Sequence, residues 1–208
     1  MTTANKITIA RIFLIPVFVM MAIYYGRSVE RGDPDPLLRL LAILAFFIAA
    51  ASDGLDGYFA RKYNQRSQLG VILDPIADKG LLLAGIITLS FSNWGYEFPL
   101  WFPVTVIARD SVIVVGTVVL HLLVGHVEVA PSFVGKMATV CQMIAVGAVM
   151  LQAPSLYAVV AFEGTAFELQ ILDIPVILAT AFTLISGVGY FVFGLRQLSE
   201  GGHGNAEI

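Results

Sequence analysis

The sequence predicts an all-α integral membrane protein of six transmembrane helices with a polar cavity on the cytoplasmic side, and three observations support this fold class. Hydrophobic residues make up 58% of the 208 residues and charged residues only 13%, whereas soluble domains are about half apolar and one quarter charged. Mean hydropathy is +0.84. Apolar runs of about 20 residues, the length that crosses a bilayer, recur along the whole chain.

The predicted helices are apolar runs bounded by polar residues, Gly or Pro: 7–25, 37–60, 71–92, 99–124, 134–152 and 171–197. The first run has no A-x-A-like cleavage site, so we expect a retained span and not a signal peptide. The segment "GRSVERGDPDP" then predicts a loop. Near the fourth run, Trp94 and Trp101 are expected to anchor the chain at the membrane interface.

The last part of the chain is less apolar between its spans. The piece 155–162 is too short to cross a bilayer, so we expect an interfacial helix there. We expect one membrane domain over 1–198 and a disordered tail over 199–208, because "SEGGHGNAEI" contains little that could be buried.

The distribution of Lys and Arg predicts that both termini face the cytoplasm. With the N-terminus inside, the cytoplasmic cations are Lys6, Arg11, Arg61, Lys62, Arg66, Lys136 and Arg196, against Arg27, Arg31 and Arg39 outside. The formal net charge of −3 argues against a nucleic-acid partner, because such proteins concentrate cations to neutralise phosphates.

One charged block interrupts the apolar pattern: "SDGLDGYFARKYNQRSQLGVILDPIADK", residues 52–79. Asp53 and Asp56 are three residues apart near the end of the second predicted helix, and Asp74 and Asp78 are four apart near the start of the third. Residues at these spacings share a helix face. Four carboxylates close to a membrane core need counter-charge, and hard oxygen ligands suit Mg²⁺, Mn²⁺ or Ca²⁺.

Small and basic residues accompany the four aspartates. Gly57 and Ala60 would let a ligand approach the helix backbone, Arg61 is suited to phosphate oxygens, and Gly70 begins the third helix without bulk. Together these residues predict a site for a metal-bound pyrophosphate. The alternative is an interfacial cluster in which Arg and Lys side chains extend to the headgroups and pair with the aspartates.

The block resembles the signature of the CDP-alcohol phosphatidyltransferase family, D-x2-D-G-x2-A-R-x8-G-x3-D-x3-D, at all eight fixed positions. The resemblance implies two metal ions, Mg²⁺ or Mn²⁺, bound by Asp53, Asp56, Asp74 and Asp78, with Asp78 also taking the proton of the acceptor hydroxyl. It implies a CDP-diacylglycerol site that includes Asn5, Thr8, Gly57, Ala60, Arg61, Ser67 and Gly70. For Asn5 and Thr8 the alternative is a helix N-cap.

The acceptor alcohol is less clearly indicated. The segments "NKITIARIFLIP", "IARD" and "GKMATVCQM" look most like family members that use glycerol 3-phosphate and give phosphatidylglycerophosphate and CMP, with Arg109 and Lys136 binding the acceptor. Thr117 stands where those members commonly have Arg. The same segments are similar to cardiolipin synthases, which use phosphatidylglycerol. For Arg109 the alternative role is a buried ion pair with Asp110, and for Lys136 an interfacial lysine.

The resemblance also implies the lipid bilayer as partner, a bacterial inner membrane with the active site facing the cytoplasm, and a possible homodimer. Two other classes of protein remain as alternatives. A cation-coupled transporter would also place aspartates in its spans, and a prenyltransferase-like enzyme would share the aspartate, metal and pyrophosphate chemistry.

Overall fold

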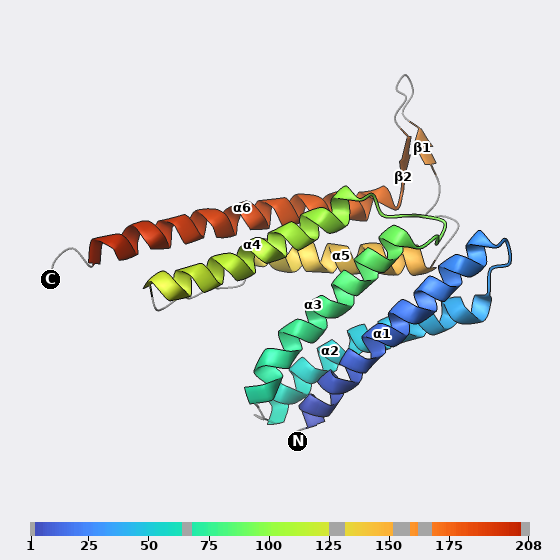
Figure 1. The fold of residues 1–208 in the computed structure, drawn as a ribbon, viewed down its shortest axis with the longest axis horizontal. Helices are drawn as coiled ribbons and strands as arrows, with labels where there is room; N and C mark the ends of the chain where they lie inside the picture. Colours follow the sequence, from blue (N-terminus) through green and yellow to red (C-terminus); the bar gives the residue numbers. More distant parts are fainter. Residues whose placement is uncertain (1–2, 64–67, 125–131, 152–158, 162–167, 205–208) are drawn as a thin grey trace. The chain divides into compact units, whose positions relative to one another are not determined.

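The computed structural model describes residues 3–63, 68–124, 132–151, 159–161 and 168–204. Six helices and two short strands occur in these ranges: α1 (Thr3–Glu30), α2 (Pro36–Tyr63), α3 (Gln68–Phe91), α4 (Trp101–Val124), α5 (Phe133–Leu151), β1 (Val159–Ala161), β2 (Glu168–Gln170) and α6 (Asp173–Gly204) (Figure 1). The six predicted helices are therefore confirmed as helices.

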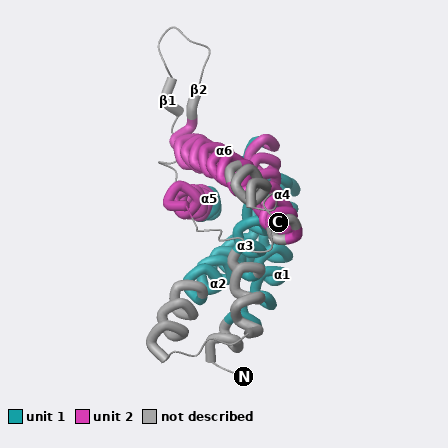
Figure 2. Tube along the Cα trace, turned by 90° about the vertical axis from the view of Figure 1, so that its left-hand side faces the viewer, with its two compact units in different colours: residues 1–99, 146–158 teal, residues 100–145, 159–208 magenta. Residues whose placement is uncertain are grey.

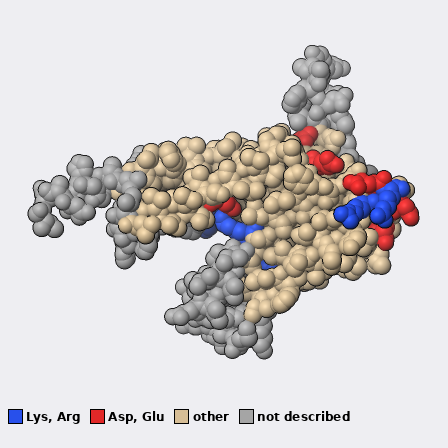
Figure 3. Space-filling model, in the orientation of Figure 1, with Lys and Arg blue, Asp and Glu red and all other residues tan. Residues whose placement is uncertain are grey.

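The helices have the length and surface of membrane spans. Within the part of the chain that the structure describes, four segments are long and apolar enough to cross a bilayer: Thr8–Glu30, Trp101–Leu120, Phe133–Leu151 and Asp173–Leu195. Large apolar side chains such as Phe13, Leu122 and Phe191 are exposed, and the face drawn in Figure 3 carries charged side chains over little of its described surface. Extensive apolar surface of this kind fits contact with lipid, so the chain is an integral membrane protein.

Unit 1 comprises residues 1–99 and 146–158, and its main helices α1, α2 and α3 pack against one another (Figure 2). The rings of Phe18 and Phe46 lie 5.3 Å apart in its core. A Cβ added to Gly85 would lie 3.1 Å from Val146 and 3.3 Å from Phe46, so α3 approaches these side chains closely because residue 85 has none.

Unit 2 comprises residues 100–145 and 159–208, and α4 packs along α6 within it. The buried amide of Gln142 on α5 donates a 3.0 Å hydrogen bond to Thr183 on α6. The strands β1 and β2 pair antiparallel with Val160 opposite Leu169. The expectation of an interfacial helix over 155–162 is wrong for 159–161, where the β-branched pair Val159 and Val160 favours a strand.

Two further expectations concern Trp94 and the C-terminal tail. Trp94 is fully buried in unit 1, where its Nε1 donates a 3.1 Å hydrogen bond to the carbonyl of Ala22. The indole therefore packs against protein and its N–H is satisfied there, and its place at the membrane interface stays a prediction. The helical backbone of α6 extends to Gly204, into the tail that we expected to be disordered from residue 199.

Candidate active site

The signature residues lie on two neighbouring helices of unit 1. Asp53 and Asp56 belong to the C-terminal part of α2, and Asp74 and Asp78 to the N-terminal part of α3. The two helices contact each other, and Figure 1 shows these two ends together at the same end of the unit as the N-terminus of α1. The helical backbone therefore gives each aspartate pair a shared face, as the sequence predicted.

The side chains of the signature lie outside the described residues. This holds for Asp53, Asp56, Gly57, Ala60, Arg61, Gly70, Asp74 and Asp78, and Ser67 lies outside them altogether. Among the side chains that are described, no group of three or more His, Cys, Asp or Glu residues could hold a metal ion. The donor set on α2 and α3, four carboxylates and no thiolate or imidazole, fits a hard divalent cation.

The first helix contributes Asn5 and Thr8 to the same end of unit 1. Because α1 begins at Thr3, both residues lie within the helix, and the alternative that either is its N-cap is wrong. Thr8 is fully buried, as is Arg11 one turn later. A basic side chain buried in an apolar helix indicates a polar interior at this end of the unit.

Arg109 is the centre of a polar cluster in unit 2. Its Nη1 lies 2.6 Å from Asp110 Oδ1, and its Nη2 donates a 2.9 Å hydrogen bond to Ser186 Oγ. Its Cζ lies 5.8 Å from the ring centroid of Tyr190. The ion pair that we considered as an alternative is therefore present. The guanidinium still has an unused donor, because its buried Nε has no hydrogen-bond partner in the described structure.

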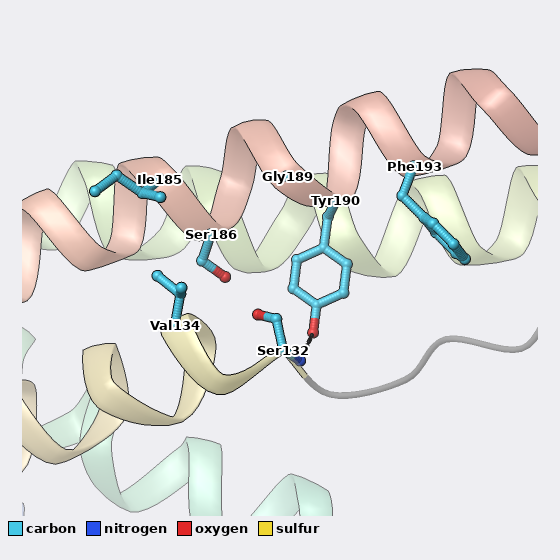
Figure 4. Close-up of a pocket in the computed structure, with 7 residues that line it drawn as sticks. All are labelled: Ser132, Val134, Ile185, Ser186, Gly189, Tyr190 and Phe193. Carbon is cyan, nitrogen blue, oxygen red and sulfur yellow. Dashed lines mark hydrogen bonds between the residues drawn. The ribbon is translucent and has the colours of Figure 1, made fainter.

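The backbone of α5 closes one side of this cluster. A Cβ added to Gly135 would lie 2.8 Å from Arg109 Nη2, so only glycine lets the guanidinium take this position. Ser132 caps α5, since its Oγ accepts the N–H of Gly135. The backbone N–H of Ser132 donates to Tyr190 Oη over 3.1 Å (Figure 4).

A pocket of about 350 Å³ opens beside the cluster, with Ser132, Ser186 and Tyr190 among its lining residues. Figure 4 shows the hydroxyl groups of these three residues between α5 and α6, with Val134 and Phe193 as apolar walls. Ser186, Tyr190 and Gly135 were not predicted from the sequence as site residues. Only the small residues beside Ser186 in "LISGVGY" signal a close helix approach there.

Lys136, the second predicted acceptor residue, follows Gly135 on α5. Its side chain is exposed, and its backbone N–H donates to Ser132 O over 3.2 Å. Lys136 and Arg109 therefore belong to the same unit, with Arg109 held in place and Lys136 accessible. Thr117, on α4, donates to the carbonyl of Ile113 over 2.7 Å and so satisfies its hydroxyl within its own helix.

These features define the class of the protein: a helical membrane protein with an acidic signature on two adjoining helices and a polar cluster around the part-buried Arg109. Residues 1–185 match the CDP-alcohol phosphatidyltransferase family. The chain belongs to that family and is an enzyme of the phosphatidyltransferase class. The transporter and prenyltransferase-like alternatives are thereby set aside.

Three bacterial relatives illustrate the similarity. The chain is 37% identical over 191 residues to the CDP-diacylglycerol–glycerol-3-phosphate 3-phosphatidyltransferase of Bacillus subtilis, covering 90% of this chain and 92% of the relative. It is 32% identical over 198 residues to the "Probable phosphatidylglycerophosphate synthase" of Mycobacterium tuberculosis H37Rv, covering 94% and 82%. It is 33% identical over 162 residues to the Escherichia coli K12 protein that carries the same name as the Bacillus relative, covering 77% and 81%.

Proposed function

We propose that the protein transfers the phosphatidyl group of CDP-diacylglycerol to glycerol 3-phosphate, giving phosphatidylglycerophosphate and CMP. The observation that carries this proposal is the similarity over 90% of the chain to a relative named for that reaction. The complete signature on α2 and α3 supports it, because this spacing of carboxylates suits a metal-bound pyrophosphate.

The chemistry assigns a role to each part of the signature. Asp53, Asp56, Asp74 and Asp78 would hold two divalent ions, Mg²⁺ or Mn²⁺, which when bound neutralise charge on the pyrophosphate. The oxygen of the acceptor hydroxyl forms a bond to the β-phosphorus, and the carboxylate of Asp78 takes the proton that this hydroxyl loses. The bond between that phosphorus and the bridging oxygen breaks, and CMP leaves with the electron pair.

The remaining site residues bind and orient the substrates. Gly57, Ala60 and Gly70 leave space for the CDP-lipid, while Arg61, Ser67, Asn5 and Thr8 supply hydrogen-bond donors to its polar part. Arg109 and Lys136 bind the phosphate of glycerol 3-phosphate, for which the planar guanidinium gives a directional contact and the ammonium a mobile charge. The unpartnered Nε of Arg109 supports this assignment.

The proposal includes the placement of the enzyme. All six helices would span the membrane, with the signature end of unit 1 forming a polar cavity at the cytoplasmic face and both termini inside. The loop charges support this orientation. Because the relatives are bacterial, we expect the cytoplasmic membrane as the location. A homodimer remains a prediction.

Replacement of Asp78 by Asn tests the mechanism. In detergent solution with CDP-diacylglycerol, Mg²⁺ and glycerol 3-phosphate, we expect the variant to release CMP at least about 100-fold more slowly, the scale of a lost general base. Asp33→Asn, at an exposed aspartate in the turn after α1, is the matched control and should retain full activity. Chelation of divalent ions should stop CMP release by the unaltered protein. Full activity of Asp78→Asn would remove Asp78 as the base.

A further inference from the structure

A groove of about 350 Å³ lies between α1 and α3 in unit 1, at the opposite end from the signature residues. It is lined by Val19, Ile23, Arg27, Glu30, Ile87, Thr88, Phe91 and Ser92. Figure 1 shows the C-terminal ends of α1 and α3 together near the turn that leads into α2. None of the lining residues belongs to the signature or to the Arg109 cluster.

Two hydroxyl groups in the groove have no hydrogen-bond partner. Thr88 and Ser92 are each only 6% exposed, yet neither side chain makes a hydrogen bond in the described structure. Other helical hydroxyls of this chain donate to the carbonyl four residues earlier, as Ser90 does to Ile86 over 2.7 Å. Neither hydroxyl oxygen is among the fully buried polar atoms that lack a partner, so each oxygen keeps some accessible surface and can bond to a polar ligand atom in the groove.

The rim of the groove carries one cation and one anion. Arg27 and Glu30 are both exposed, and within the described residues no ion pair joins them to each other or to a third group. The neighbouring charges cancel, since Arg31 and Arg39 are accompanied by Asp33 and Asp35. This balance favours a headgroup with both charges over an anionic headgroup.

The apolar part of the groove runs along the axis of α1, as an acyl chain beside a membrane span does. Val19, Ile23, Arg27 and Glu30 follow one another at helical spacing on one face of α1. They extend over about 16 Å, from a rise of about 1.5 Å per residue, which is close to half the hydrocarbon thickness of a bilayer. Because the predicted span ends at Glu30, the charged rim lies at headgroup level.

Tight packing fixes the headgroup end of the groove. A Cβ added to Gly26 would lie 3.0 Å from Ser92 Cβ and 3.1 Å from the backbone nitrogen of Asn93, so α1 and the end of α3 are in close contact. The ring of Trp94 packs 4.5 Å from that of Tyr25, measured between centroids. The groove is therefore preformed by the packing of unit 1.

We propose that this groove binds a zwitterionic phospholipid whose headgroup carries a phosphate and an ammonium group. The phosphate accepts hydrogen bonds from Arg27 and from the hydroxyls of Thr88 and Ser92, and the ammonium pairs with Glu30. One acyl chain extends over the apolar wall of α1 and α3. The site is separate from the transferase reaction and does not rest on the proposed function.

Native mass spectrometry of the full-length, delipidated protein in detergent tests the proposal, with phosphatidylethanolamine and phosphatidylglycerol as competing probes. We expect phosphatidylethanolamine to bind at least about tenfold more tightly than phosphatidylglycerol. Phosphatidylglycerol has no ammonium group to pair with Glu30, and the loss of one charge-assisted contact corresponds to about this factor. Thr88→Val should weaken its binding by about the same factor. Thr105→Val is the matched control and should bind normally, because that hydroxyl already donates to Trp101 O over 2.7 Å.

Two further variants separate the contributions of headgroup and chain. Glu30→Gln should reduce the affinity for phosphatidylethanolamine to that for phosphatidylglycerol, and Ile87→Trp should fill the groove and weaken both lipids without altering a polar contact. Thermal unfolding checks that each variant is folded. Equal binding of the two lipids by the unaltered protein would overturn the proposal, as would binding that is unchanged in both Thr88→Val and Ile87→Trp.

Discussion

Gly135→Ala should weaken acceptor binding while leaving the fold almost intact. A Cβ at residue 135 would lie 2.8 Å from Arg109 Nη2, whereas ordinary Cβ contacts begin at 3.4 Å. The guanidinium must therefore move by at least the difference, about 0.6 Å. Because the obstructing atom is the far end of a flexible side chain, the clash is relieved by moving Arg109 and not the backbone.

The displacement acts on a guanidinium that has few ways to compensate. Arg109 is held by Asp110 at 2.6 Å and by Ser186 at 2.9 Å. Moving Nη2 away from Gly135 disturbs the bond to Ser186 and the direction of the remaining donors. A hydrogen bond to a charged group contributes about 1.5–3 kcal/mol, so loss of one contact with the acceptor phosphate raises KM about 10- to 100-fold.

Steady-state CMP release at varied glycerol 3-phosphate measures this effect. We expect KM for glycerol 3-phosphate to rise about tenfold or more with a smaller change in kcat, and the apparent Kd for CDP-diacylglycerol to stay unchanged. Ser186→Ala should give the same pattern, because it removes the same bond to Arg109. Thr180→Ala is the control on α6, since its hydroxyl donates only to Val176 O over 2.8 Å. Normal KM values in both Gly135→Ala and Ser186→Ala would show that the position of Arg109 does not determine acceptor binding.

Two further predictions concern the stability of the units. Trp94→Phe should lower the free energy of unfolding by about 1–3 kcal/mol, because the bond to Ala22 and some packing are lost. Trp101 is half-exposed, so Trp101→Phe should change that free energy little. Equal shifts of the thermal unfolding midpoint in the two variants would contradict this. Thr183→Val should destabilise more than Gln142→Leu, because it leaves a buried amide without its partner whereas Thr183 keeps its bond to Ala179 O. The reverse order in thermal unfolding would contradict it.

The helices and the acidic signature could be predicted because their signals are local in sequence. An apolar run of about 20 residues has few alternatives to a membrane helix. The spacing of the aspartates in "SDGLD" and "LDPIAD" can be read directly from the sequence and fixes their shared helix face. The end of α1 was predicted less accurately, at residue 25. The segment "GRSVE" continues the helix to Glu30, because no residue before Gly32 requires a positive φ.

The features that the sequence did not predict depend on contacts between distant residues. The burial of Trp94 depends on the carbonyl of Ala22, 72 residues away in sequence, which accepts its indole N–H. Ser186 contacts Arg109 across 77 residues of sequence. The β1–β2 pair joins segments that are each too short to signal a strand alone.

The lipid product formed from CDP-diacylglycerol shows which acceptor the enzyme uses. The purified protein would be given equal concentrations of glycerol 3-phosphate and phosphatidylglycerol with Mg²⁺, and the lipids analysed by mass spectrometry. We expect phosphatidylglycerophosphate and CMP in equal amounts, and neither product after divalent ions are chelated. Cardiolipin as the main product, or no lipid product while the protein is folded, would contradict it.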